Sequence, residues 1–338
     1  MGCYRHRHAC TRIILIRNLL GQRVTDSQLA FVFPGQGSQS LGMLAELANA
    51  HASIRDTFAE ASQGAGVDLW TLSQHGPEDR LNRTEYTQPA LLAGGIAVWR
   101  AWLQQGGSQP TVLAGHSLGE YSALVAAGAL TLSDAAKLVH LRGQLMQEAA
   151  PAGTGAMAAV LGADDALVLQ VCEAVSSDDV VVPANFNSPG QIVIGGHAPA
   201  VDRALAMLAE RGVRKVVKLA VSVPSHTPLM REAANRLSAA MHDIEWHEPS
   251  FPVIQNVDAE VHDGTQSIRD ALVRQLYLPV QWTGCVQALA ARGVVRIAES
   301  GPGRVLTGLA KRIDKSLDAR PLGTPDEFGV AFSEWKNN

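Results

Sequence analysis

The sequence predicts an α/β protein in which a large parallel-sheet subdomain is interrupted by a smaller inserted one. Two observations predict the large part: short apolar runs are typical of buried strands, and helical patterns separate those runs. Strands that alternate with helices form a parallel sheet with helices on both faces. A third observation, a different order of strand and helix patterns in the middle of the chain, predicts the insertion.

The large subdomain is predicted from strands and helices that follow one another along the chain. The apolar run at 30–33 ends at a Pro-Gly pair, which indicates a buried strand entering a tight loop. A second buried strand is predicted at 111–114, followed by a helix at 118–128 with Ala and Leu on nearly every face. A helix that is apolar all round lies inside a protein. The pattern resumes with strands at 253–256 and 294–298.

The middle of the chain has a different order of elements. Strands are predicted at 156–161, 180–183, 191–194 and 214–219, and helices at 164–175 and 199–211. This β-α-β-β-α-β order over about 70 residues is ferredoxin-like. The expected division is a discontinuous large subdomain at 27–152 and 222–320, a ferredoxin-like subdomain at 153–221 and a C-terminal tail at 321–338.

The first 25 residues differ from the rest, because they hold five arginines and no acidic residue. A basic presequence is typical of a targeting peptide. The start Met1-Gly2 is compatible with lipidation, but myristoylation requires Ser or Thr where this chain has His6. A third interpretation is that residues 1–25 precede the folded protein and have no role. In each case we expect a disordered presequence.

Composition excludes several classes of function. Hydrophobic residues make up 46% and charged residues 18% of the 338, as in globular enzymes with a sizeable core. The net charge of −4 does not favour nucleic-acid binding. The longest apolar run, 121–132, is shorter than the roughly 18 residues of a membrane span. The four cysteines form neither a Cys-x-x-Cys motif nor a disulfide framework, which favours a reducing cytoplasm.

Residues 115–119 match the Gly-x-Ser-x-Gly pattern, with a predicted strand before it and a helix after it. The turn is too sharp for side chains on either side, which explains Gly115 and Gly119. Ser117 then lies at the positive end of a helix, where backbone N–H groups face a developing negative oxygen. The pattern favours a nucleophilic serine, and the alternative is a tight turn with a serine N-cap.

A serine hydroxyl needs a base to act as a nucleophile at neutral pH. His226 lies in the proline-containing loop 222–228, directly after the last strand of the inserted subdomain. A loop that re-enters the large subdomain there lies between the two subdomains, where clefts form. His116, next to the serine, is the rival candidate, and the residues alone leave both open.

The glycine-rich loop at 33–39 follows the first strand. Its spacing fails the Gly-x-Gly-x-x-Gly pattern and it lacks a Gly-Lys-Ser/Thr sequence, which argues against a nucleotide site. The other use of such a loop is to present a backbone N–H to an oxyanion.

Seven motifs occur in order along the chain. They are F-V-F-P-G-Q-G-S-Q (31–39), T-Q-P-A-L-L (87–92), G-H-S-L-G-E-Y-S-A-L (115–124), L-R-G-Q-L-M (141–146), S-V-P-S-H (222–226), R-Q-L-Y-L-P-V-Q-W (274–282) and G-P-G-R-V-L-T-G-L (301–309). Together they resemble the malonyl-CoA:acyl carrier protein transacylase family of fatty-acid synthesis and, more distantly, polyketide synthase acyltransferase domains. The resemblance covers about 28–312 and implies an α/β-hydrolase-like large subdomain interrupted by a ferredoxin-like one. Family members begin shortly before the first strand, which makes Val24 a candidate natural start.

The resemblance also implies roles for individual residues. Ser117 would be the nucleophile and His226 the general base. The backbone N–H groups of Gln36 and Leu118 would form the oxyanion hole.

Four further positions complete the implied site. Arg142 would pair with the malonyl carboxylate. The backbone carbonyl of Gln275 would orient the imidazole in place of an acidic residue. Gln88 and His116 would line the acyl pocket.

The implied activity is transfer of malonyl from malonyl-CoA to the phosphopantetheine thiol of acyl carrier protein, through an ester on Ser117 and with ping-pong kinetics. The resemblance implies no permanently bound cofactor and no metal, because malonyl-CoA is a substrate and the carrier supplies the phosphopantetheine. The expected partners are acyl carrier protein and CoA, with no nucleic acid and no membrane. We expect a monomer.

Other functions stay open. A serine thioesterase or esterase would use an acidic third residue and would not require Arg142. A non-catalytic binder of carrier proteins would need neither Ser117 nor His226. Malonyl loading in polyketide synthesis or malonate metabolism is a sister role. The segment 75–79 matches the His-x-x-x-Asp motif of another acyltransferase class, but it lies in a polar loop and we interpret it as a chance match.

Overall fold

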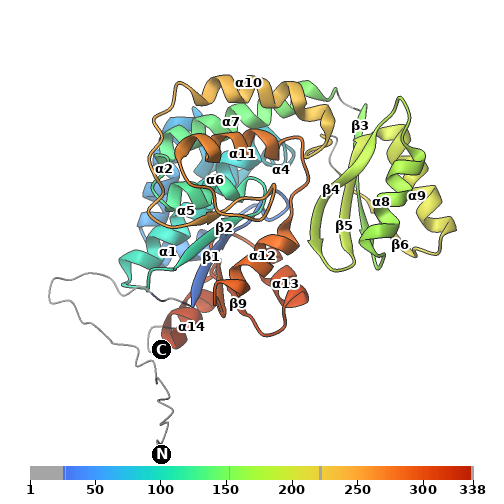
Figure 1. The fold of residues 1–338 in the computed structure, drawn as a ribbon. Coiled ribbons are helices and arrows are strands. Elements are labelled where there is room, and N and C mark those ends of the chain that lie inside the picture. The colour runs from blue at the N-terminus through green and yellow to red at the C-terminus, as the bar shows by residue number, and fades with distance from the viewer. Residues whose placement is uncertain (1–25, 27, 152, 221–222, 336–338) are drawn as a thin grey trace, which may run out of the picture.

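The computed structural model describes residues 26, 28–151, 153–220 and 223–335. The prediction for the presequence at 1–25 concerns residues outside this range. Figure 1 shows a large helix-rich subdomain beside a smaller sheet that carries two helices on its outer side. Within the described ranges, no helix is both long and apolar enough to cross a membrane.

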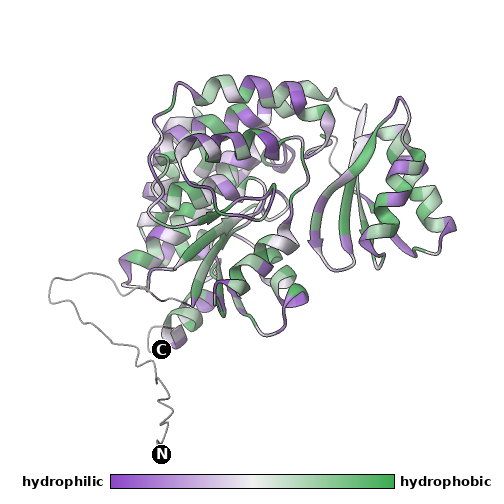
Figure 2. Cartoon of the chain, viewed as in Figure 1, coloured by the Kyte–Doolittle hydropathy of each residue, from purple (hydrophilic) through white to green (hydrophobic). Residues whose placement is uncertain are grey.

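The large subdomain is built on a five-stranded sheet in the order β7-β2-β1-β8-β9, in which every neighbouring pair is parallel. Its strands are β1 (Leu29–Phe33), β2 (Val112–Gly115), β7 (Val253–Ile254), β8 (Arg296–Glu299) and β9 (Asp318–Pro321). The predicted parallel sheet is confirmed, and Figure 2 shows that its strands are largely hydrophobic.

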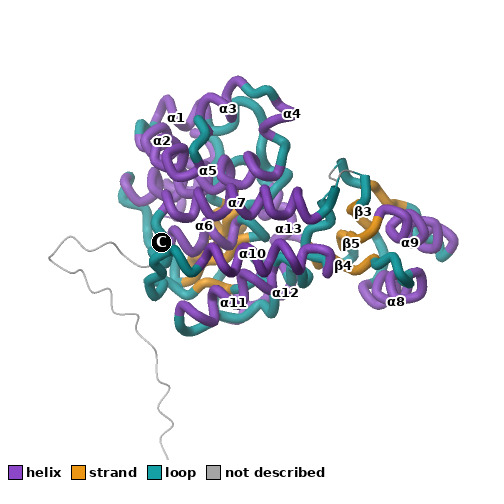
Figure 3. Tube along the Cα trace, turned by 90° about the horizontal axis from the view of Figure 1, so that it is seen from above, coloured by secondary structure: helices purple, strands orange, loops and turns teal. Residues whose placement is uncertain are grey.

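Helices cover both faces of this sheet (Figure 3). They are α1 (Ala45–Ala50), α2 (Ser53–Ala65), α3 (Leu69–His75), α4 (Glu78–Leu81), α5 (Thr84–Gln104), α6 (Gly119–Ala126), α7 (Leu132–Ala149), α10 (Arg231–Met241), α11 (Thr265–Gln275), α12 (Trp282–Ala291), α13 (Val305–Ile313) and α14 (Pro325–Trp335), with a 3₁₀ turn at Pro228–Met230. Successive side chains of β1 alternate between two cores: Phe31 packs among the helices of the larger core, and Val32 packs with residues of α12 and α13. The strand is therefore apolar throughout, as a central parallel strand must be.

The small subdomain contains a second sheet in the order β4-β5-β3-β6, in which all pairs are antiparallel. Its elements are β3 (Gly155–Leu161), α8 (Asp165–Val175), β4 (Val181–Ser188), β5 (Gln191–His197), α9 (Ala198–Glu210) and β6 (Lys215–Lys218). This is the predicted ferredoxin-like arrangement. β4 is longer than the strand predicted at 180–183, because polar Asn185 and Asn187 interrupt the apolar pattern on which that prediction depended.

Main-chain hydrogen bonds join the two subdomains along β4. The Phe186 N–H donates to the Val280 carbonyl at 2.9 Å, and the Val280 N–H donates to the Ala184 carbonyl at 2.9 Å. The hydroxyl of Thr283 in α12 adds a bond of 3.1 Å to the Phe186 carbonyl. The edge of the small sheet is thus attached directly to the large subdomain.

The C-terminal region differs from the tail expected at 321–338. β9 joins the large sheet, and α14 buries Phe328, Ala331 and Trp335 against the core. These residues recur at a spacing of three and four, which is the apolar stripe of a packed helix.

Candidate active site

Ser117 lies on the turn between β2 and α6, with a left-handed φ of 51°. Such a conformation costs about 1–3 kcal/mol in a residue other than glycine, and it persists only where the surroundings enforce it. A Cβ on Gly119 would lie 1.9 Å from the Phe33 carbonyl oxygen, and one on Gly115 would lie 1.9 Å from the Gly119 backbone. Only glycines at these two positions let β1, β2 and α6 approach so closely.

His226 faces the serine. Its Nε2 lies 2.8 Å from the Ser117 Oγ, and its Nδ1 lies 2.6 Å from the backbone carbonyl oxygen of Gln275. A carbonyl only accepts hydrogen bonds, so Nδ1 carries the proton and Nε2 presents a lone pair to the hydroxyl. This is the geometry of a general base whose tautomer is set by its second nitrogen.

The surroundings of His226 suppress its positive charge. Burial is the main reason why its pKa falls to about 3, and the charge of Arg142 adds to the effect. The hydrogen bond to Gln275 opposes this shift and does not cancel it. The imidazole is therefore neutral at pH 7 and able to accept a proton.

His116, the rival base, points elsewhere. Its Nε2 lies 2.8 Å from the Asn187 Oδ1, so the bond crosses from the large to the small subdomain. Burial lowers the pKa of His116, which keeps it neutral as well. Its position suits the wall of an acyl pocket, and the geometry favours His226 as the base.

Arg142 is the charged group nearest the nucleophile, and only 1% of it is exposed. Its Nη1 donates to the Gln88 Oε1 at 2.8 Å and its Nη2 to the Gln275 Oε1 at 2.9 Å, while Nη2 lies 3.4 Å from the Ser117 Oγ. Both strong partners are neutral amides, and Nε has no partner among the described residues. A buried guanidinium of this kind is stabilised most by a carboxylate, which binds both arms of the fork.

The two residues of the predicted oxyanion hole, Gln36 and Leu118, line the same cleft as Ser117. Among the described residues, neither the Gln36 N–H nor the Leu118 N–H donates a hydrogen bond within the protein. The N–H of Ser117 itself is occupied, because it donates to the Asn256 Oδ1 at 2.7 Å. The two amides therefore stay candidate donors to an oxyanion in this cleft.

These side chains border one cleft of about 670 Å³ between the subdomains. Seven of the predicted residues line it, namely Gln36, Gln88, His116, Ser117, Leu118, Arg142 and His226. Gln275 lies beneath them, fully buried, and contacts both Arg142 and His226. The described residues contain no cluster of three His, Cys, Asp or Glu that could hold a metal ion.

Comparison with known proteins agrees with this geometry. The model of the acyl transferase domain matches residues 30–316. The malonyl CoA-acyl carrier protein transacylase of Salmonella typhimurium is 53% identical over 308 residues, which are 91% of this chain and 100% of that protein. The chain belongs to the malonyl-CoA:acyl carrier protein transacylase family. The resemblance seen in the seven motifs is confirmed.

Solved structures of the family have the same fold. The transacylase from Xanthomonas oryzae pv. oryzae superposes with a TM-score of 0.92 at 73% identity, covering 92% of this chain and 99% of that one. A malonyl-transacylase solved in complex with a type II polyketide synthase acyl-carrier protein has a TM-score of 0.89 at 50% identity, covering 92% of this chain and 100% of that one.

Three groups in this transacylase site were not predicted from the sequence. They are the side chains of Glu120 and Asn256, and the side-chain amide of Gln275. Asn256 follows β7, which is the neighbour of the nucleophile strand β2. Polar residues at the carboxyl ends of adjacent parallel strands meet at one edge of the sheet, so the strand order would have been the signal.

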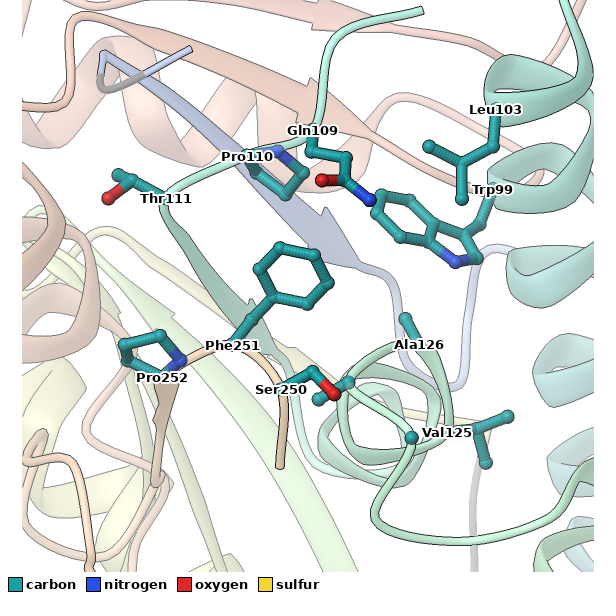
Figure 4. A pocket seen from close by; sticks show the side chains of 12 residues that line it. Trp99, Leu103, Gln109, Pro110, Thr111, Val125, Ala126, Ser250, Phe251 and Pro252 are labelled. Carbon is teal, nitrogen blue, oxygen red and sulfur yellow. The ribbon is translucent and has the colours of Figure 1, made fainter. Parts of the chain in front are cut away.

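A second cavity of about 630 Å³ lies at the other end of the sheet's strands from the candidate active site. Figure 4 shows Trp99 and Phe251 in its wall, and their ring centroids are 6.2 Å apart. Thr111 and Pro252, also in its wall, directly precede β2 and β7. This cavity is therefore at the amino ends of the strands, away from the edge where ligands of open α/β sheets bind, and it holds none of the predicted residues.

Proposed function

We propose that the protein transfers malonyl from malonyl-CoA to the phosphopantetheine thiol of acyl carrier protein, for fatty-acid synthesis, through a malonyl ester on Ser117. The observation that carries the proposal is the Ser117–His226 hydrogen bond of 2.8 Å beside a buried Arg142 whose partners are neutral. The Ser117–His226 pair supplies a nucleophile and its base, and Arg142 supplies a site for the carboxylate of the acyl group.

In the first half-reaction, the Ser117 Oγ attacks the thioester carbonyl while the His226 Nε2 takes the hydroxyl proton. The negative oxygen of the tetrahedral intermediate accepts hydrogen bonds from the Gln36 and Leu118 amides. When the intermediate collapses, the carbon–sulfur bond breaks and Nε2 protonates the sulfur of CoA. The Gln275 carbonyl holds Nδ1–H throughout and stabilises the transient imidazolium.

In the second half-reaction, the carrier thiol enters the cleft that CoA has left. The His226 Nε2 takes the thiol proton, and the sulfur attacks the malonyl ester. Ser117 leaves with that proton, so the enzyme returns to its starting state. The two substrates therefore bind in turn, which gives ping-pong kinetics.

Arg142 accounts for the choice of malonyl. Its planar fork matches a carboxylate and keeps its charge even where burial lowers its pKa. An acetyl group would leave the guanidinium buried and unpaired, and a site built for a polar group rejects the analogue that lacks it. Gln88 holds one arm of Arg142 in place, and His116 lies against the same cleft.

Acyl carrier protein is the proposed macromolecular partner, and we propose a cytoplasmic monomer without a permanently bound cofactor, nucleic acid or membrane contact. A second candidate is malonyl loading in polyketide synthesis, which is favoured by the 50% identical relative solved with such a carrier. A thioesterase is less compatible with the site, because the His226 imidazole bonds a carbonyl where hydrolases use a carboxylate.

Intact-mass spectrometry after brief incubation with malonyl-CoA tests the proposal. Wild-type protein should gain one malonyl mass, located by peptide mapping within 115–119, and Ser117→Ala should gain none. Adding acyl carrier protein should discharge the adduct onto the carrier. An adduct elsewhere, or release of free malonate without a carrier, would contradict the proposed function.

A further inference from the structure

The backbone of the nucleophile is held by a side chain from a neighbouring strand. Asn256, which is fully buried, accepts the Ser117 N–H on its Oδ1 at 2.7 Å and donates from its Nδ2 to the Gly115 carbonyl at 2.7 Å. One amide thus spans the two sides of the turn. The orientation of the amide is fixed, because the reverse would set N–H against N–H and oxygen against oxygen.

Asn256 is itself held by two other buried polar residues, Glu120 and Gln275. Its backbone N–H donates to the Glu120 Oε2 at 2.8 Å, and the same oxygen accepts the Gln275 Nε2 at 3.0 Å. Gln275 Nε2 also donates to the Ser117 carbonyl at 3.0 Å. Glu120, Asn256 and Gln275 therefore form a fully buried polar layer beneath the nucleophile.

The backbone at Ser117 needs support from its surroundings. Ser117 is held in a left-handed conformation between two glycines, and glycines are the residues best able to relax. A displacement of about 1 Å in a reacting group can lower the rate about 100-fold. The bond to Asn256 also occupies the Ser117 N–H, which leaves the oxyanion to the Gln36 and Leu118 amides.

We propose that Asn256 is the positioning residue of Ser117: it holds the strained turn so that the hydroxyl faces the His226 Nε2. Asn256 is not among the residues that line the cleft, and its side chain bonds the backbone of the turn on either side of Ser117. The inference rests on the proposed function for the identity of the natural substrate alone. Its test does not, because a correctly oriented serine should also react with an electrophile unrelated to malonyl-CoA.

The variant Asn256→Asp separates positioning from general stability. A neutral aspartic acid can reproduce both hydrogen bonds, since its C=O accepts the Ser117 N–H and its O–H donates to the Gly115 carbonyl. An ionised aspartate has no donor and would repel the Gly115 oxygen. The new carboxyl would lie beside Glu120 of α6 and Cys285 of α12, both of which contact Asn256. The charges of Arg142 in α7 and Asp258 in the turn after β7 also act on this buried layer, because both influence the pKa of Glu120.

The probe is a fluorophosphonate, which needs no malonyl group. Ser117 Oγ attacks its phosphorus, fluoride leaves, and the His226 Nε2 takes the hydroxyl proton. We expect labelling per folded molecule to fall about 10–100-fold in Asn256→Ala at every pH and in Asn256→Asp at pH 8. In Asn256→Asp alone, the labelling rate should recover as the pH is lowered and the new carboxyl takes up its proton.

Gln255→Glu is the matched control, because it also buries a carboxyl on the same segment and, among the described residues, the Gln255 side chain donates its hydrogen bond to the Val253 carbonyl rather than to the nucleophile turn. It should label at the wild-type rate per folded molecule at each pH. Full labelling by Asn256→Ala, or a loss in Asn256→Asp that does not depend on pH, would overturn the proposal. If the alanine variant does not fold, Asn256→Asp decides alone. A wild type that reacts with the fluorophosphonate and not with malonyl-CoA would refute the proposed function and leave this inference standing.

Discussion

The imidazole of His226 contacts the Ser117 hydroxyl and stays neutral at pH 7, and both properties determine how the reaction should depend on pH. A base must be unprotonated, so its activity is present above its pKa and is lost as the pH falls through it. The pKa of His226 is lowered to about 3 by burial first and by the Arg142 charge second. The rate of enzyme acylation should therefore stay flat between pH 5 and 7, where a histidine in water loses its activity.

Rapid-quench measurement of malonyl-enzyme formation would check this expectation. In Arg142→Ala the neighbouring charge is absent, so the inflection should move to higher pH. An inflection near 6.5 in the wild type would mean that His226 is solvated during the reaction or is not the base.

In the proposed function Arg142 selects the acyl group, and replacing it tests specificity apart from chemistry. Arg142→Ala removes the carboxylate partner and leaves Ser117 and His226 in place. A charge-assisted hydrogen bond contributes roughly 1.5–3 kcal/mol, so malonyl transfer should fall by about 10–150-fold. Acetyl transfer should hold steady or rise, because the pocket no longer contains an unpaired cation. Values of kcat/KM for both acyl-CoAs decide the matter, and an equal fall for both would make Arg142 structural.

At the scale of elements, the site depends on how closely α6 approaches β1. In Gly119→Ala the new Cβ would lie 1.9 Å from the Phe33 carbonyl, so the helix must move away from the strand and carry the Leu118 amide with it. We expect both lower stability and a loss of acylation. Gly308→Ala on α13 is the control, since a Cβ there meets nothing within 4 Å and alanine favours a helix by about 1 kcal/mol. Thermal melting and acylation rates of both variants would test this; wild-type behaviour of Gly119→Ala would contradict it.

Prediction of the elements from the sequence succeeded where apolar periodicity was strong and failed where another cause determined the structure. The strand at 30–33 and the helices of the small subdomain follow directly from their apolar patterns. β4 was predicted too short, because its polar second half is held by pairing with β5 and with Val280 and not by apolar burial alone. α14 was interpreted as a tail, because its buried Phe328 and Trp335 stand among charged residues at the end of the chain.

Prediction of the site was uneven for a related reason. Local spacing pointed to Ser117, but it left His226 and His116 as rivals, and only the resemblance to a family separated them. Arg142 had no local signal, since it lies in the middle of a helix far from the serine in sequence. Asn256 was missed because its role depends on the order of the strands, which periodicity does not reveal.

At the scale of the whole molecule, the polar layer links the active site to stability. Burial raises the pKa of Glu120 to about 8, whereas an unfolded carboxyl ionises near 4.5. Between these values the folded state holds a proton that the unfolded state lacks, so this group's contribution to stability falls as the pH rises, by at most about 1.4 kcal/mol per pH unit. Glu120→Gln imitates the neutral form and does not titrate.

The free energy of unfolding in urea should therefore decline relative to Glu120→Gln as the pH rises from about 4.5 to 8. The lowered pKa of His226 acts in the opposite sense, because stability rises with pH from about 3 towards 6.5, but it does so in both proteins and cancels in the difference. Parallel stability curves for the two proteins would show that Glu120 is ionised in the folded state.

The attachment of β4 to the large subdomain also bears on how the protein behaves at high concentration. An open sheet has two edges, and each unpaired edge is a template on which another chain can add a strand and begin an aggregate. One edge of the small sheet is occupied by the Val280 segment. The other edge is β6, a short strand that carries Lys215 and Lys218 on either side of its two valines. Short strands that carry exposed lysines are one way in which sheet edges discourage the addition of another strand, so both edges of the small sheet have a feature that opposes aggregation.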